Sequence, residues 1–249
     1  WQDTGEAPNF MDINIYDSDD MTDNSILTFE SLNHVLDVGT PFPLFESYLN
    51  SYSTYIHFLK FGWGSALVDP DFSRKSNLCK QLNVRPVLGG TFFEYMIHRH
   101  SFDEFLRHIE SFGLDCVELS RGTIDLDDST YCSYIKKLSS NFFVMSEVGR
   151  KSSDPEFELT PQQWIDHCEI SVQSGASLIV LESRESGRSG YVSDSGQVDS
   201  VLLESITARL PVGCFLFEAP IKSVQTYLIK RYGPNVNIGN ISLDDLVAV

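Results

Sequence analysis

Short apolar runs recur along the chain, and each ends in a polar residue or a glycine. Eight runs are separated by stretches about one helix long: His34–Asp37, Ile56–Lys60, Pro86–Gly90, Cys116–Ser120, Phe142–Glu147, Leu178–Glu182, Cys214–Glu218 and Val236–Asn240. A buried strand of a parallel sheet reads as a continuous apolar run, and alternation with helices favours parallel pairing. The pattern predicts an α/β protein built as a single (β/α)8 TIM barrel.

Helix signals lie between these runs. Thr160, Pro161 and Gln163 form a predicted N-terminal cap, with proline at the first helical position and glutamine at the capping-box position. Aromatic and aliphatic residues from Phe102 to Phe112 recur at helical spacing. Both segments are typical of helices that cover a barrel.

Polar residues end most of the apolar runs. In a barrel of this kind the chemistry sits at the carboxyl ends of the strands. These residues are therefore expected to meet at one mouth: Asp37, Lys60, Glu118, Ser120, Glu147, Glu182, Glu218 and Asn240. Several carboxylates and a lysine in one cavity indicate an enzyme.

Four of these residues are glutamates at the ends of consecutive runs: Glu118, Glu147, Glu182 and Glu218. Clustered carboxylates repel one another unless a cation lies among them, and hard oxygen ligands suit Mg²⁺. We take them as candidate metal ligands. Salt bridges to Lys60, Lys151 or Arg184 are the alternative that the sequence leaves open.

Anion-binding candidates follow the later runs. The tract after Glu182 places Arg184 among serines and glycines, so Arg184, Ser186 and Gly187 are expected to bind an anionic group. A flexible surface loop is the alternative. Loops after the seventh and eighth strands of such barrels often bind phosphate. Candidates there are Lys222, Asn237 and Asn240, unless the last segment is merely a turn-rich closing strand.

Composition narrows the function classes. The 249 residues carry a formal net charge of −17, which argues against binding to nucleic acid or to anionic membranes. No apolar run approaches the length of a membrane span. The first basic residue is Lys60, so we expect residues 1–28 to form an acidic N-terminal arm and residues 29–249 to form the barrel.

The five cysteines are widely spaced and form no Cys-x-x-Cys pair. This spacing favours neither a zinc site nor a disulfide framework. We interpret the chain as a reduced, cytoplasmic protein. Whether it forms a homo-oligomer is left open by the sequence.

Several motifs together resemble the phosphosulfolactate synthase family. They run in order along the predicted barrel: Lys60-Phe-Gly-Trp-Gly-Ser-Ala, Gly89-Gly-Thr-Phe-Phe-Glu94, Glu118-Leu-Ser-Arg-Gly-Thr-Ile-Asp125, Ser146-Glu-Val-Gly-Arg-Lys151, Arg184-Glu-Ser-Gly187, Phe217-Glu-Ala-Pro-Ile-Lys222 and Gly233-Pro-Asn-Val-Asn-Ile-Gly-Asn-Ile241. The resemblance implies a lyase-type enzyme that uses Mg²⁺ to add sulfite to phosphoenolpyruvate, with (2R)-3-phospho-2-sulfolactate as the expected product. That product feeds coenzyme M in some organisms and sulfolactate in others.

This chemistry gives the candidate residues expected roles. Sulfite is expected to attack the middle carbon of phosphoenolpyruvate, and a metal ion would stabilise the resulting enediolate. Lys151, which matches a lysine of the family motif, is the expected general acid at the methylene carbon. Lys60 and Arg184 are the further catalytic candidates, while Arg184 and Lys222 would hold anionic groups.

The sequence also departs from the family pattern. Val38 stands where the family usually has lysine, a basic residue is missing around Glu30, and Arg121 replaces an aspartate or asparagine. Arg121 restores one positive charge at the mouth and is a candidate substrate-binding residue. Two alternatives follow: another nucleophile in place of sulfite, or a non-catalytic barrel kept for protein interaction.

Overall fold

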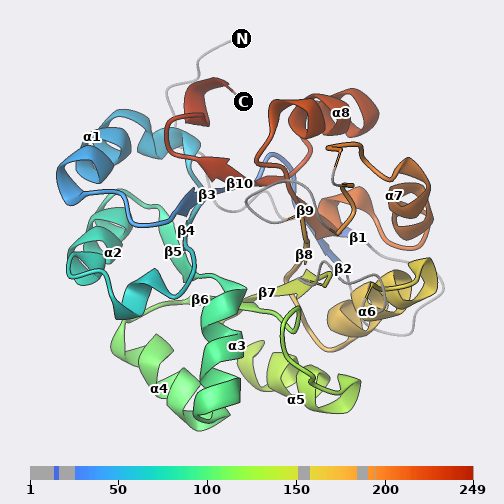
Figure 1. The fold of residues 1–249 in the computed structure, drawn as a ribbon, viewed down its shortest axis with the longest axis horizontal. Coiled ribbons are helices and arrows are strands. Elements are labelled where there is room, and N and C mark those ends of the chain that lie inside the picture. The colour runs from blue at the N-terminus through green and yellow to red at the C-terminus, as the bar shows by residue number, and fades with distance from the viewer. Residues whose placement is uncertain (1–13, 17–25, 151–157, 184–189, 194, 249) are drawn as a thin grey trace.

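A computed structural model describes residues 14–16, 26–150, 158–183, 190–193 and 195–248. Its main sheet has eight parallel strands in the order β5-β4-β3-β10-β9-β8-β7-β6, curled into a barrel (Figure 1). The strands are β3 (Asn33–Asp37), β4 (Phe58–Phe61), β5 (Arg85–Leu88), β6 (Cys116–Leu119), β7 (Phe143–Val148), β8 (Leu178–Leu181), β9 (Phe215–Glu218) and β10 (Ile238–Ser242). Each of the eight predicted runs overlaps one of them, so the predicted fold class is confirmed.

Helices surround the barrel (Figure 1). They are α1 (Phe42–Tyr52), α2 (Phe72–Gln81), α3 (Gly90–Arg99), α4 (Phe102–Ser111), α5 (Asp128–Leu138), α6 (Pro161–Gln173), α7 (Ser200–Thr207) and α8 (Lys222–Tyr232), with short 3₁₀ turns at Ser53–Tyr55, Ser65–Leu67, Val212–Cys214 and Leu246–Ala248. The predicted capping box is confirmed, because Thr160 and Gln163 exchange side-chain and backbone hydrogen bonds at the start of α6. No helix in the described residues is long and apolar enough to cross a membrane.

The barrel is not hydrogen-bonded all the way round. Within the described residues, no backbone ladder joins β5 to β6, which are the two ends of the sheet. Side chains connect these strands instead: Arg85 bonds Asp115 at 2.9 Å where the strands begin, and the Gly90 amide donates to Glu118 Oε1 at 2.6 Å where they end. This seam places the N-terminus of α3 against the mouth.

The interior of the barrel is packed with apolar side chains. Phe58, Val87, Met145 and Leu216 are among the buried residues of this inner cluster. Phe29 closes it at the end where the strands begin, with its ring 5.5 Å from that of Phe143. A packed interior leaves the opposite end of the barrel for chemistry.

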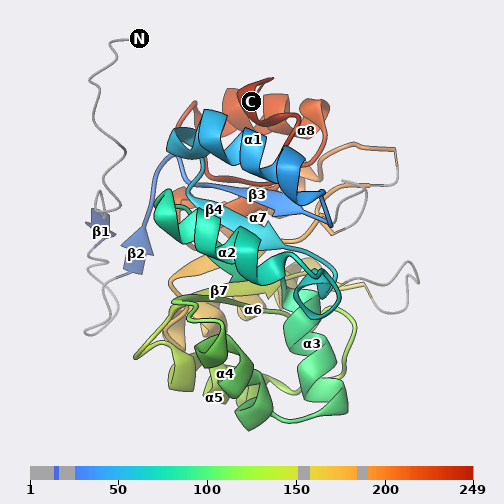
Figure 2. The same ribbon diagram turned by 90° about the vertical axis from the view of Figure 1, so that its left-hand side faces the viewer.

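Part of the predicted N-terminal arm forms a two-stranded antiparallel sheet of β1 (Asn14–Tyr16) and β2 (Ile26–Thr28). Figure 2 shows this pair on the side of the barrel where its strands begin. The Cys214 thiol lies 3.6 Å from the Leu27 carbonyl oxygen, so β2 contacts the turn before β9. The remaining residues of the arm up to position 25 lie outside the described part of the chain.

Candidate active site

A cavity of about 80 Å³ opens at the carboxyl ends of the barrel strands. Five of the predicted site residues line it: Lys60, Glu147, Glu182, Glu218 and Asn240. They come from strands far apart in the sequence, or directly follow them, as the parallel topology predicts. Trp63 and Thr123 contribute to the rim, and the backbone of Gly89 and Gly90 forms part of the wall.

Lys60 is a buried cation on the wall of this cavity. Its Nζ atom lies 2.9 Å from Glu118 Oε1 and 3.0 Å from Glu218 Oε1. Glu147 Oε2 is 3.8 Å away. Burial by itself would lower the pKa of Lys60, but the three carboxylates outweigh it and hold this pKa well above its usual value. Lys60 therefore keeps its positive charge at neutral pH.

Glu118 lies beneath the cavity and is 1% exposed. Its Oε1 atom accepts from both Lys60 and the Gly90 amide at the N-terminus of α3, where the helix dipole favours an anion. Burial opposes ionisation, yet Lys60 and His34 keep the pKa of Glu118 below its usual value. The carboxylate is thus a fixed negative charge.

His34 was missed as a site residue by the sequence analysis. Its Nδ1 atom accepts the Asn240 amide at 2.8 Å, which leaves the proton on Nε2, 3.8 Å from Glu118 Oε2. The only sequence signal is a polar residue at the start of an apolar strand. His34 thus bonds the end of β10, while its Nε2 atom faces Glu118 beyond hydrogen-bond distance.

Asn240 has an unusual backbone conformation, with φ of 56°. Its side-chain oxygen is buried and has no hydrogen-bond partner among the described residues. Strained residues with unsatisfied polar groups cluster at ligand sites. The predicted substrate-binding role of Asn240 fits this position on the cavity wall.

Glu94 is the second residue that the sequence analysis did not assign to the site, although it lies in one of the quoted motifs. It is buried on α3 and accepts hydrogen bonds from the Ser120 hydroxyl, the Gly122 amide and the Thr123 hydroxyl. Ser120 Oγ also contacts Glu147 Oε1 at 2.7 Å. Glu94 is thereby connected to the cavity through one hydroxyl group.

The four glutamates predicted as metal ligands do not form a common oxygen cage. In the part of the chain that the structure describes, no three His, Cys, Asp or Glu side chains converge on a point that could hold a metal. Lys60 takes the position of a cation among three of them. This geometry corresponds to the salt-bridge alternative for Glu118 and Glu218, and we assign neither of them to a metal.

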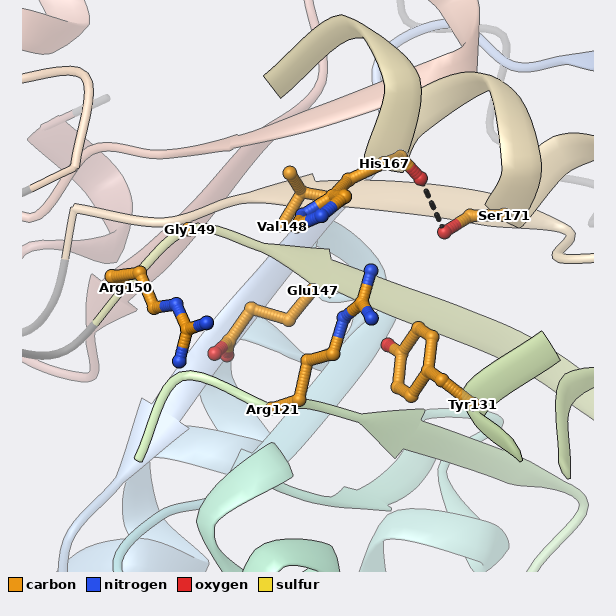
Figure 3. A pocket seen from close by; sticks show the side chains of 8 residues that line it. All are labelled: Arg121, Tyr131, Glu147, Val148, Gly149, Arg150, His167 and Ser171. Carbon is orange, nitrogen blue, oxygen red and sulfur yellow. Dashed lines mark hydrogen bonds between the residues drawn. The ribbon is translucent and has the colours of Figure 1, made fainter. Parts of the chain in front are cut away.

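Glu147 also lines a second, smaller pocket (Figure 3). Arg121 and Arg150 lie on either side of the Glu147 side chain there, beside His167 and Tyr131. The Arg121 guanidinium bonds Asp128 at 2.5 Å and stacks over Tyr131 at 4.7 Å. Burial, with Arg121 nearby, lowers the pKa of His167 to about 4. Arg121 therefore lines this second pocket and is not among the residues that line the cavity.

Two further predicted site residues, Asn237 and Lys222, are not brought to the cavity. Asn237 precedes β10 and lies at the opposite end of the barrel. There its Oδ1 atom accepts the Leu32 amide, and its Nδ2 atom donates to the carbonyls of Phe29 and Phe215. Lys222 begins α8, is about half exposed and pairs with Asp245 at 3.4 Å. Lys151, Arg184, Ser186 and Gly187 lie outside the described residues.

Comparison with known proteins agrees with this architecture. The family described as (2R)-phospho-3-sulfolactate synthase (ComA) matches residues 29–249. The phosphosulfolactate synthase of Methanocaldococcus jannaschii is 36% identical over 222 residues, which cover 88% of each chain. That of Bacillus subtilis is 33% identical over 216 residues, or 86% of each chain.

A solved structure shares the fold alone. The YdjI aldolase of Escherichia coli K12 superposes with a TM-score of 0.56 at 11% identity, covering 88% of this chain and 77% of that one. The sequence matches carry more, because they span the barrel and include the residues around the cavity. The chain belongs to the phosphosulfolactate synthase family.

Proposed function

We propose that this protein adds sulfite to phosphoenolpyruvate, forming a carbon–sulfur bond and (2R)-phospho-3-sulfolactate. The observation that carries the proposal is Lys60, a buried and permanently charged ammonium group on the wall of the cavity. An electron-rich enol phosphate with a neighbouring carboxylate needs such a charge when a nucleophile adds to it. Membership of the family supplies the substrate pair.

The proposed product differs from the expected (2R)-3-phospho-2-sulfolactate. The family is named for a 3-sulfolactate, which carries its sulfur on C3, so we propose attack at the methylene carbon in place of attack at the middle carbon. The chemical reason is that attack on the methylene carbon moves the double-bond electrons to C2, next to the carboxylate that can delocalise them. Attack at C2 would leave the charge on C3, without that delocalisation.

The balanced sequence has two steps. A sulfur lone pair of sulfite forms the bond to C3, and the C2–C3 π electrons move onto C2 and its carboxylate as an enediolate. A proton then forms the C–H bond at C2, and the phosphate stays in place. Lys60 would stabilise the enediolate, because Glu118 and Glu218 hold its ammonium group in position before substrate binds.

The remaining roles stay predictions. The resemblance makes Lys151 a proton donor and Arg184 an anion holder, with Ser186 and Gly187 beside it. Mg²⁺ belongs to the proposal as an ion that arrives with the substrate, since Mg²⁺ is ordinarily held by one or two carboxylates together with substrate oxygens. We assign no ligands to it and derive no step through it.

Phosphorus NMR tests the proposal. Purified protein with phosphoenolpyruvate, sulfite and Mg²⁺ should convert the enol phosphate signal into an alkyl phosphate signal, and omission of sulfite should abolish the conversion. Consumption of phosphoenolpyruvate only with a different nucleophile would replace sulfite in the proposal. A folded protein that neither binds nor converts phosphoenolpyruvate would contradict it.

A further inference from the structure

Trp63 occupies a tight turn that disfavours a bulky residue. Its backbone is left-handed, with φ of 57°, and the next residue, Gly64, is left-handed as well, with φ of 67°. The Ser65 amide donates to the Gly62 carbonyl oxygen at 2.9 Å and closes the turn around them. Positive φ at both central positions is the pattern of a type I′ turn, in which glycine, asparagine and aspartate dominate. Tryptophan is a steric outlier at this position.

The other left-handed residues of the chain are smaller. Besides Trp63, the non-glycine residues with positive φ in the described ranges are Ser31, Asn83 and Asn240. Asparagine visits this region readily, because its short polar side chain can hydrogen-bond locally. Of the four residues, Trp63 and Asn240 line the cavity. Backbone strain concentrates at functional sites, so the conformation of Trp63 indicates a role at the cavity.

The end of β3 holds this turn in place. The Gly62 amide donates to the Asp37 carbonyl oxygen at 2.9 Å. A Cβ atom at Gly62 would lie 2.9 Å from Leu36 Cδ1, so the backbone packs directly against the side chain of a neighbouring strand. Trp63 therefore has little freedom to relieve its strain by a shift of the loop.

The chemistry of an indole suits the edge of this cavity. Trp63 is 64% exposed, so much of its apolar surface contacts water there. Burial of that surface against a ligand is favourable, and an indole also supplies one N–H donor and no acceptor. The cavity is lined by the carboxylates of Glu147, Glu182 and Glu218. An anion that enters it needs donors of this kind.

Two other donors on the cavity wall already bond to carboxylates. Lys60 contacts Glu118 Oε1 at 2.9 Å, and the Thr123 hydroxyl donates to Glu94. Trp63, exposed at the rim, can meet an incoming anion without the loss of such a contact.

We propose that Trp63 is retained in its strained turn to bind the substrate: the indole ring packs over phosphoenolpyruvate, and its N–H donates to an anionic oxygen. The identity of the bound molecule rests on the proposed function, whereas the strain does not. Displacement of water by the ring would strengthen the attraction between Lys60 and the enediolate. No proton or electron pair passes through Trp63.

Thermal unfolding tests the strain. Trp63→Asn places a preferred residue in the turn, so the melting temperature should rise by about 2 °C or more. Tyr55→Asn is the matched control, because Tyr55 is also an aromatic residue with 64% exposure but has no positive φ. This control should bring no rise. A Trp63→Asn protein that melts at or below the temperature of the wild type would overturn the strain.

Fluorescence quenching tests the contact with substrate. The chain has three tryptophans, Trp1, Trp63 and Trp164, and Trp164 is buried in the core. In a Trp1→Phe background, acrylamide should quench the exposed Trp63, and saturating phosphoenolpyruvate should protect it. Protection should vanish when Trp63→Phe is added, with binding of phosphoenolpyruvate verified by calorimetry. Binding by calorimetry without protection in Trp1→Phe would refute the contact.

Kinetics separate the ring from the N–H group. A hydrogen bond to a charged group is worth about 10-fold or more in affinity. Trp63→Phe loses only the donor, so its Michaelis constant for phosphoenolpyruvate should rise by about 10-fold, and Trp63→Ala, which loses the ring as well, should exceed it. Tyr55→Ala, near the start of β4, should keep the constant of the wild type.

Failure of the proposed function has a different signature. A folded wild type that neither binds nor converts phosphoenolpyruvate would contradict the proposed function and the contact with Trp63 together. Normal turnover, with an unchanged Michaelis constant in Trp63→Ala, would contradict the contact alone.

Discussion

Lys60 and Glu118 form a buried ion pair, 2.9 Å from Nζ to Oε1, that connects β4 to β6. These two strands share no backbone ladder in the described structure, because β5 and the seam lie between them. The same Glu118 oxygen accepts the Gly90 amide at the start of α3. One carboxylate therefore joins both sides of the seam and positions the lysine of the cavity.

Removal of Lys60 is expected to destabilise the fold as well as to stop the reaction. Lys60→Met leaves Glu118 buried without its cation, and breaking one partner of a buried pair costs about 3–5 kcal/mol. Urea denaturation should show a loss of that size in the free energy of unfolding. Lys230→Met, at an exposed lysine of α8, is the control and should change it little.

The double variant Lys60→Met with Glu118→Gln should recover part of this loss, because it removes the uncompensated charge. A Lys60→Met protein as stable as Lys230→Met would show that the pair contributes nothing to the fold.

His167 is expected to make the protein sensitive to acid. Its pKa is lowered to about 4 by burial, with Arg121 adding to the effect. The unfolded chain binds this proton near pH 6.5 and the folded protein only near pH 4. Stability from this residue is therefore complete above about pH 6.5 and is lost as the pH falls toward 4.

The measurement is the free energy of unfolding of the wild type and His167→Gln between pH 7 and pH 4. The variant should lose less stability over this window than the wild type. His98→Gln, which replaces an exposed histidine of α3, is the matched control. Parallel curves for the wild type and His167→Gln would contradict the assignment.

Gly90 is expected to tolerate no side chain. A Cβ atom there would lie 2.4 Å from Ser120 Cβ and 3.4 Å from Glu118 Oε1. Relief of that overlap requires α3 to move away from β6, at a cost of about 1–3 kcal/mol. Gly90→Ala should lower the melting temperature and weaken turnover together. Tyr95→Ala, at an exposed position of the same helix, should preserve turnover.

Magnesium is expected to be required for turnover, since the anionic substrate meets several carboxylates at the cavity. Chelation should abolish the reaction, and Mg²⁺ should restore it. Because the described glutamates do not form a metal cage, chelation of the free protein should leave its melting temperature unchanged. Full turnover without a divalent ion would remove Mg²⁺ from the proposal.

The sequence predicted the fold well because burial in a parallel sheet makes each strand a continuous apolar run. It predicted the polar strand ends for the same reason: Lys60, Glu147 and Glu218 stand where a run stops. The same reasoning did not predict the position of Asn237. The predicted strand Val236–Asn240 began two residues too early. Since each strand residue advances about 3.3 Å, Asn237 and Asn240 lie well apart along the barrel axis.

Glu94 and His34 were missed for a different reason. Their contacts to Ser120 and Glu118 depend on the seam and on the left-handed backbone of Asn240. Neither feature leaves a local signal in the sequence. The pairing of Lys60 with the glutamates was foreseen only as an alternative to a metal, because charge clustering alone does not say which cation lies among carboxylates.

Carbon NMR of the product tests the central claim most directly. Phosphoenolpyruvate labelled with ¹³C at its methylene carbon is incubated with sulfite, Mg²⁺ and the protein. Attack at C3 predicts that the label becomes a saturated CH₂ group bonded to sulfur, next to a C2 that carries one hydrogen. A labelled methyl group would mean that sulfite attacked C2, and a label that stays vinylic would mean that the reaction does not occur.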